Sequence, residues 1–158
     1  MNSASSTASI EWLHILSSTF LFGTGIGSAF YMLFANISRD VRAIAVVSRI
    51  VVVADWLFTA TTIIVQPLTG YYLVRIAGFS MSSRWLAWSI GLYVLAAACW
   101  LPVVWLQMRL RDMAVQAARD GSALPPQYWR YFRLWIALGI PALFAFVAIF
   151  YLMVAKPA

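Results

Sequence analysis

Two ionisable side chains, His14 and Asp55, lie inside long apolar stretches of this sequence, and they are the residues best placed to do chemistry. In a membrane helix an imidazole can ligate a metal, and haem iron is the usual metal of a lone membrane histidine. The imidazole can equally be an interfacial side chain that hydrogen-bonds Glu11, a backbone carbonyl or water. Because the chain has one histidine, a second iron ligand would come from another side chain, from water or from a partner chain.

Three further residues indicate a possible ligand-binding site near His14. At about 1.5 Å of helical rise per residue, His14 and Gln66 lie at similar depths, roughly 13 Å and 8 to 10 Å to the outer side of the membrane midplane. Gly23 and Gly27 form a small-xxx-small pair, which lets a neighbouring helix or a flat ligand approach closely. The sequence predicts either a haem b site made by His14, Gly23, Gly27 and Gln66, with His14 as the metal ligand, or ordinary helix packing.

Asp55 has two interpretations of its own. It lies roughly five residues inside the second apolar stretch, where an ionised carboxylate is costly unless it is paired or hydrated. The first interpretation is a structural ion pair with Arg130 or Arg133, at the start of the fourth stretch. The second is an intramembrane proton-relay residue.

Other catalytic patterns are missing from the sequence. It has no HExxH motif, no phosphate-binding loop and no dinucleotide-binding fingerprint. Its one cysteine, Cys99, lies in an apolar run, which predicts neither an internal disulfide nor a cysteine-based metal site. Whether the protein is an enzyme therefore stays open, and no catalytic residue is assigned.

Four long apolar stretches must position these residues, at about 10–36, 50–74, 85–107 and 131–155. The chain of 158 residues is 63% hydrophobic and 10% charged, whereas a soluble domain has about 25% charged residues. We therefore predict an all-α fold, a transmembrane four-helix bundle with up-down-up-down topology, in a single domain over residues 1–158. The segment 37–49 is expected to be a linker, and Pro67 to kink the second helix by freeing the carbonyl of Ile63.

The distribution of basic residues predicts the orientation of the chain. The first and third connections carry eight of the eleven basic residues, and the opposite side carries three. The positive-inside rule then places both termini on the periplasmic side of a bacterial inner membrane. The net charge of +6 is accordingly assigned to topology and to anionic lipid headgroups in the bilayer, with no nucleic acid as a partner.

Short motifs support a resemblance to known membrane proteins. The opening Trp12-Leu13-His14-Ile15-Leu16, followed by a glycine-rich half-helix, resembles the first helix of a bacterial family of predicted integral membrane proteins of unknown function. The stretches Pro67-Leu68-Thr69-Gly70 and Trp85-Leu86 fit the same pattern. The resemblance covers nearly the whole chain and implies the same four spans.

More distantly, the layout is similar to that of the four-helix membrane-type protoporphyrinogen IX oxidase. In that family a histidine early in the first helix is implicated in haem b binding, and His14 matches it. The family also has a lysine early in its third helix, shortly after a Trp-Leu pair. The matching stretch here, Trp85 to Ile90, contains no lysine, so the resemblance implies haem binding but not the oxidase activity.

Two functions follow as expectations. The first is a small inner-membrane protein that binds haem b through His14 and has a redox or haem-handling role. The second is a non-catalytic accessory or structural subunit, whose apolar faces pack against a larger membrane complex or against another copy of the chain. A transporter that uses Asp55 and the Pro67 kink is less favoured, because four spans without an internal repeat do not resemble the usual transporter architectures.

Overall fold

The computed structural model describes residues 3–157, and its regular elements in this range are all helical. Three segments, α2 (Val41–Ala54), η1 (Asp55–Thr59) and α3 (Ala60–Ile76), form one continuous helix in which η1 is a single π-helical turn. The other helices are α1 (Ser3–Ser38), α4 (Arg84–Asp120) and α5 (Pro126–Ala155). Within the described range four helices are thus long and apolar enough to cross a membrane, which confirms the predicted all-α four-helix bundle.

The expected linker at 37–49 is wrong, because this segment is almost entirely helical. Arg39 and Asp40 alone separate α1 from α2. The Asp40 carboxylate accepts hydrogen bonds from the backbone N–H groups of Arg42 (2.8 Å) and Ala43 (3.2 Å) and so caps the N-terminus of α2. The helix therefore begins well before the apolar stretch that it carries into the membrane.

The end of α4 lies well beyond its apolar part. The helix continues past its apolar part to Asp120, and Gly121 follows with a left-handed backbone (φ 63°), which suits glycine at a helix C-terminus. Pro126 then opens α5, where the missing N–H of proline costs no helical hydrogen bond.

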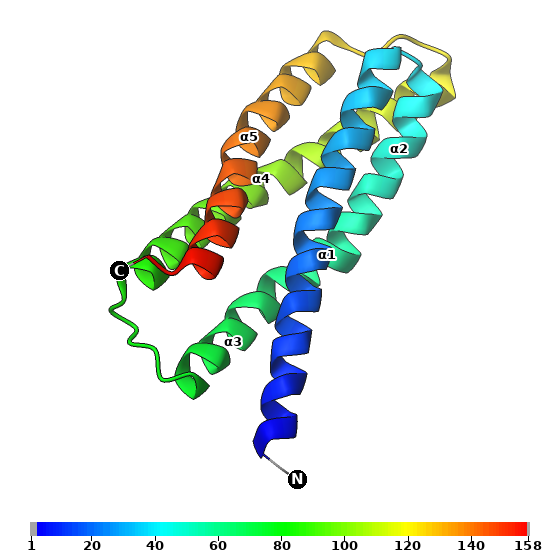
Figure 1. Cartoon of the computed structure of the whole chain (residues 1–158). Helices are drawn as coiled ribbons and strands as arrows, with labels where there is room; N and C mark the ends of the chain where they lie inside the picture. The colour runs from blue at the N-terminus through cyan, green and yellow to red at the C-terminus, as the bar shows by residue number, and fades with distance from the viewer. Residues whose placement is uncertain (1–2, 158) are drawn as a thin grey trace.

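The bundle is tightly packed at the end that carries the α1–α2 and α4–α5 turns, the upper end in Figure 1. There the fully buried Tyr128 hydroxyl donates to Asn36 Oδ1 at 2.8 Å, while the Asn36 amide donates to Met32 O at 2.8 Å. The Arg39 guanidinium lies 4.1 Å from the ring centre of Trp129. Apolar side chains of α1, α2, α4 and α5 complete this core.

Toward the other end, the bundle separates into two helix pairs, α1 with α3 and α4 with α5 (Figure 1). Contacts between α1 and α5 are few. The α3–α4 loop packs at this end, where the Phe79 ring contacts Trp85 (5.4 Å between centroids) and lies 4.7 Å from Lys156 Nζ. Four crossings bring both termini to this same end.

Pro67 lies inside α3, and its predicted effect on Ile63 is visible in the structure. The Ile63 carbonyl accepts a hydrogen bond from the hydroxyl of Tyr93 in α4, at 2.6 Å. This bond supplies the partner that the proline cannot supply, and it also ties α3 to α4.

Candidate functional site

The first polar cluster joins α1 to α3 around His14. The imidazole Nδ1 lies 2.7 Å from Thr69 Oγ1, and Nε2 lies 3.3 Å from Gln66 Nε2. Ser17, one turn along α1, donates to Gln66 Oε1. His14 and Gln66, paired in the sequence by depth, are therefore in contact, whereas the roles of Thr69 and Ser17 were not predicted.

The hydrogen bonds around His14 form a chain whose directions are mutually consistent. The Thr69 hydroxyl donates to the Val65 carbonyl (2.8 Å), so its oxygen can accept from His14 Nδ1–H. The Nε2 lone pair then accepts from the Gln66 amide, whose oxygen accepts from Ser17. We assign a neutral imidazole with its proton on Nδ1 on the basis of this network.

The two glycines expected near His14 do not take part in this cluster. Gly23 and Gly27 follow His14 along α1 by 9 and 13 residues, roughly 13 and 20 Å of helical rise. A Cβ atom built on either one would meet no atom within 4 Å, so neither glycine is needed for close helix packing in this chain. Gly70 is the glycine in contact with the imidazole, because its Cβ would lie 3.2 Å from His14 Cε1.

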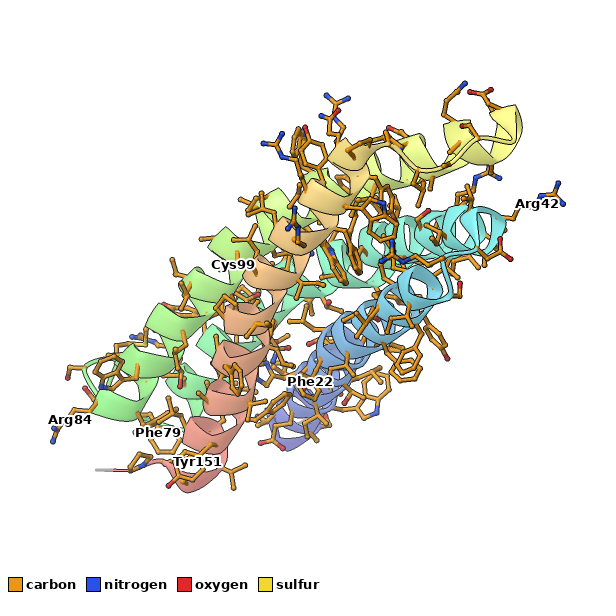
Figure 2. The ribbon with its side chains drawn as sticks, turned by 90° about the horizontal axis from the view of Figure 1, so that it is seen from above. Phe22, Arg42, Phe79, Arg84, Cys99 and Tyr151 are labelled. Atoms are coloured by element: carbon orange, nitrogen blue, oxygen red, sulfur yellow. The ribbon has the colours of Figure 1, made fainter. Side chains whose placement is uncertain are left out.

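The second polar site lines a groove of about 430 Å³ between α1 and α5, with η1, α3 and α4 forming its floor. Most of its wall is apolar and comes from α1 and α5. Phe22 lies between these two helices in Figure 2, and its ring meets Phe150 edge-on with 5.1 Å between centroids. The volume is within the range of small-molecule sites, roughly 300 to 1,000 Å³.

Asp55 lies on the floor of this groove and is 4% exposed. Its Oδ1 accepts from the Thr59 hydroxyl at 3.1 Å, and the Gln107 amide of α4 lies beside the same carboxyl group. Both Asp55 and Thr59 belong to the π-helical turn η1, a local irregularity that occurs often at functional sites.

Neither Arg130 nor Arg133 pairs with Asp55. Within residues 3–157, the ion pair that the structure contains is Arg111 with Asp112. Because the helix begins at Val41 rather than near residue 50, Asp55 lies near the middle of a continuous helix that ends at Ile76. The two arginines lie near the start of α5, toward the packed end of the bundle, and within residues 3–157 no ion pair joins either of them to Asp55.

Three buried polar atoms in the described part of the chain lack a hydrogen-bond partner: Trp100 Nε1, Gln107 Oε1 and Trp135 Nε1. All three side chains line the groove together with Asp55. Leaving a buried polar group unpaired costs about 1–3 kcal/mol. Three unpaired polar groups on side chains that line one groove call for an explanation.

The sequence offers a weak signal for this second site. Tryptophans such as Trp100 and Trp135 are common in membrane helices. Gln107 falls at the boundary expected for the third span. The amide of Gln107 is buried because α4 continues to Asp120, well beyond the apolar stretch. Within residues 3–157 no group of three His, Cys, Asp or Glu side chains is arranged to hold a metal ion.

Comparison with known proteins places the whole chain in one group. A family model described as "Predicted integral membrane protein (DUF2269)" matches residues 8–157. This confirms the resemblance to predicted integral membrane proteins that the first helix suggested, and the description names no activity. No curated protein and no solved structure matches the chain.

Proposed function

This chain belongs to the DUF2269 family of predicted integral membrane proteins, and we propose that it binds a lipid-soluble small molecule within the bilayer, in the groove between α1 and α5. The observation that carries the proposal is the set of unpaired buried atoms on Trp100, Gln107 and Trp135, three side chains that line one cavity. The hydrocarbon tail of a lipid can fill an apolar groove but cannot pair with an indole N–H or an amide oxygen. The site therefore favours a molecule with an apolar body and a polar end.

The groove opens between two helices that make little contact, so a ligand dissolved in the bilayer can reach it sideways. Phe22 and Phe146 lie at the apolar part of the site and Asp55 at its polar floor. A ligand would thus have its polar end held near the middle of the membrane, shielded from both aqueous phases. Such a protein would hold or hand over a hydrophobic compound.

Native mass spectrometry of the full chain, released from mild detergent, tests this proposal. The wild type should retain a small molecule, and Trp135→Phe, which replaces the indole with a smaller phenyl ring that has no N–H, should retain much less of it. Trp88→Phe is the matched control, because Trp88 is 67% exposed and does not line the groove. Equal retention by all three proteins, or a wild type that retains nothing and is not stabilised by any long-chain probe, would reject the proposal.

Haem binding through His14 is a second candidate, supported by the hydrogen bonds of its imidazole. Histidines that ligate a metal through one ring nitrogen commonly donate the other N–H to an acceptor, as His14 Nδ1 does to Thr69. Among residues 3–157, the hydrogen-bond partner of Nε2 is the Gln66 amide, at 3.3 Å, and this amide would have to move away for iron to bind. Bound haem would supply one-electron chemistry.

The visible absorption spectrum of the purified protein tests the haem candidate. A Soret band that disappears in His14→Ala and persists in Asp55→Asn would support it. If no Soret band appears after haem is supplied during expression, His14 is an interhelical hydrogen-bonding residue and the haem candidate is rejected.

An accessory-subunit function has one supporting observation. Almost none of the most apolar part of α5 is buried, a smaller share than in the other long helices. In a bilayer this face contacts either lipid or the helix of another protein. A stoichiometric membrane partner that co-purifies in mild detergent, and is lost on Phe144→Arg at the 68%-exposed Phe144, would favour docking through α5.

A further inference from the structure

We propose that the ligand of the groove is a lipophilic amine, bound with its ammonium group at Asp55 and an oxygen near the two indole N–H groups. This inference rests on the proposed ligand-binding function and specifies the chemical class of the ligand. Four observations lead to it: a buried carboxyl group without a cationic partner, an unpaired amide oxygen, two unpaired indole N–H groups, and an apolar wall.

The carboxyl group of Asp55 determines the charge that we expect on the ligand. It is almost fully buried, and its neighbours Thr59 and Gln107 are both neutral. No cationic side chain among residues 3–157 pairs with it. An ionised carboxylate inside a membrane is expensive when it is unpaired, so a positive charge carried by the ligand would be strongly favoured there.

The unpaired atoms determine the rest of the polar end. An ammonium group has three N–H donors and no acceptor, so it can donate to Asp55 and to Gln107 Oε1 together. The indole N–H groups of Trp100 and Trp135 require an oxygen instead. A hydroxyl or carbonyl oxygen on a carbon near the amine would meet this requirement, which makes a long-chain amino alcohol the simplest fit.

The groove wall determines the body of the ligand. Apart from its floor, the cavity is lined by apolar side chains such as Ile26, Leu33, Leu143 and Phe146. These residues come from α1 and α5, so they form two facing apolar walls. An extended hydrocarbon chain can lie between them, continuous with the lipid that surrounds the bundle.

A head-group series that keeps the C18 chain constant tests the inference. The probes are sphinganine, octadecylamine, octadecan-1-ol and octadecanoate, titrated into the full chain in mild detergent with calorimetric detection. Since hydrogen bonds to charged groups are worth about 1.5–3 kcal/mol, octadecylamine should bind about tenfold or more tightly than octadecan-1-ol. Sphinganine should bind most tightly, and octadecanoate most weakly because its charge repels Asp55.

Two variants locate the contacts. Asp55→Asn should remove the preference for octadecylamine over octadecan-1-ol, and Trp135→Phe should weaken sphinganine more than octadecylamine. Trp88→Phe should leave all four affinities unchanged. The comparison of probes on the wild type needs no variant, so it holds even if Asp55→Asn does not fold.

The outcomes separate the two proposals. If octadecan-1-ol binds as tightly as octadecylamine, the amine inference is overturned, while ligand binding in the groove stands. If none of the four probes binds and no endogenous molecule is retained, both fail. An octadecylamine preference that survives Asp55→Asn also overturns the inference, because the charge would then be recognised elsewhere.

Discussion

The hydroxyl of Tyr93 in α4 lies 2.6 Å from the carbonyl oxygen of Ile63 in α3, the carbonyl that Pro67 cannot pair. Ile63 also lines the floor of the groove. This one hydrogen bond thus satisfies the carbonyl that the proline leaves unpaired, and it holds together α3 and α4, two of the helices that form the candidate site.

Tyr93→Phe should therefore destabilise the protein by about 1–3 kcal/mol, because the Ile63 carbonyl would be left unpaired in a membrane interior. Thermal unfolding in detergent measures the effect. The control is Tyr151→Phe, since Tyr151 is 67% exposed. In a Pro67→Ala background, which restores an N–H to position 67, the cost of Tyr93→Phe should be clearly smaller; an unchanged cost would contradict this account of the bond.

The tightly packed end of the bundle, which carries the α1–α2 and α4–α5 turns, offers a second test. Tyr128 and Asn36 are buried and share a 2.8 Å hydrogen bond. Tyr128→Phe should cost about 1–3 kcal/mol, because the Asn36 carbonyl oxygen would lose its donor without gaining water. Asn36→Ala and Tyr128→Phe should combine to less than the sum of their separate costs. Strict additivity in the double variant would show that this bond contributes nothing to stability.

Asp55→Asn should separate stability from binding. The variant replaces a buried carboxyl group that has no cationic partner in the described chain, while an amide can still accept from Thr59. The ligand-free protein should therefore unfold at the same or a higher temperature, and it should lose its preference for amine head groups. A large drop in melting temperature in ligand-free detergent would instead assign Asp55 a structural role.

Substitution by alanine should affect stability differently at two glycines. Gly91→Ala places its new methyl group in open space, so it should stabilise the protein by about 0.5–1 kcal/mol through helix propensity. Gly70→Ala brings a methyl carbon within 3.2 Å of His14 Cε1, so the imidazole must shift and the gain should be lost. Equal stabilisation of the two variants would show that His14 is not held against α3.

The orientation of the chain is testable with reporters fused to the C-terminus. Eight basic residues on the first and third connections predict that both termini face the periplasm. Alkaline phosphatase fused after residue 158 should be active in intact cells, and a fused green fluorescent protein exported by the same route should stay dark. The reverse pattern would invert the topology.

Hydropathy was sufficient to predict the four helices, because lipid exposure requires long apolar segments whatever they pack against. Hydropathy did not predict the helix at 37–49. This helix begins at a capping aspartate, before the apolar stretch, and neither feature changes the hydropathy. Depth placed His14 and Gln66 in one layer of the membrane, but their contact depends on the packing of α1 against α3. The groove could not be predicted from the sequence. Gln107, Trp100 and Trp135 line one cavity because α1 and α5 make few contacts, and residue spacing within one helix does not show how two helices pack.

Photolabelling tests ligand binding in the groove most directly. Diazirine-bearing C18 probes with amino-alcohol and alcohol head groups would be activated on the full chain in lipid nanodiscs, and the labelled positions mapped by mass spectrometry. The account predicts labels concentrated on groove residues such as Ile26 and Leu143, and competition by excess unlabelled sphinganine for the amino-alcohol probe. Labels spread evenly over outward-facing residues such as Trp88 and Tyr151, without competition, would contradict it.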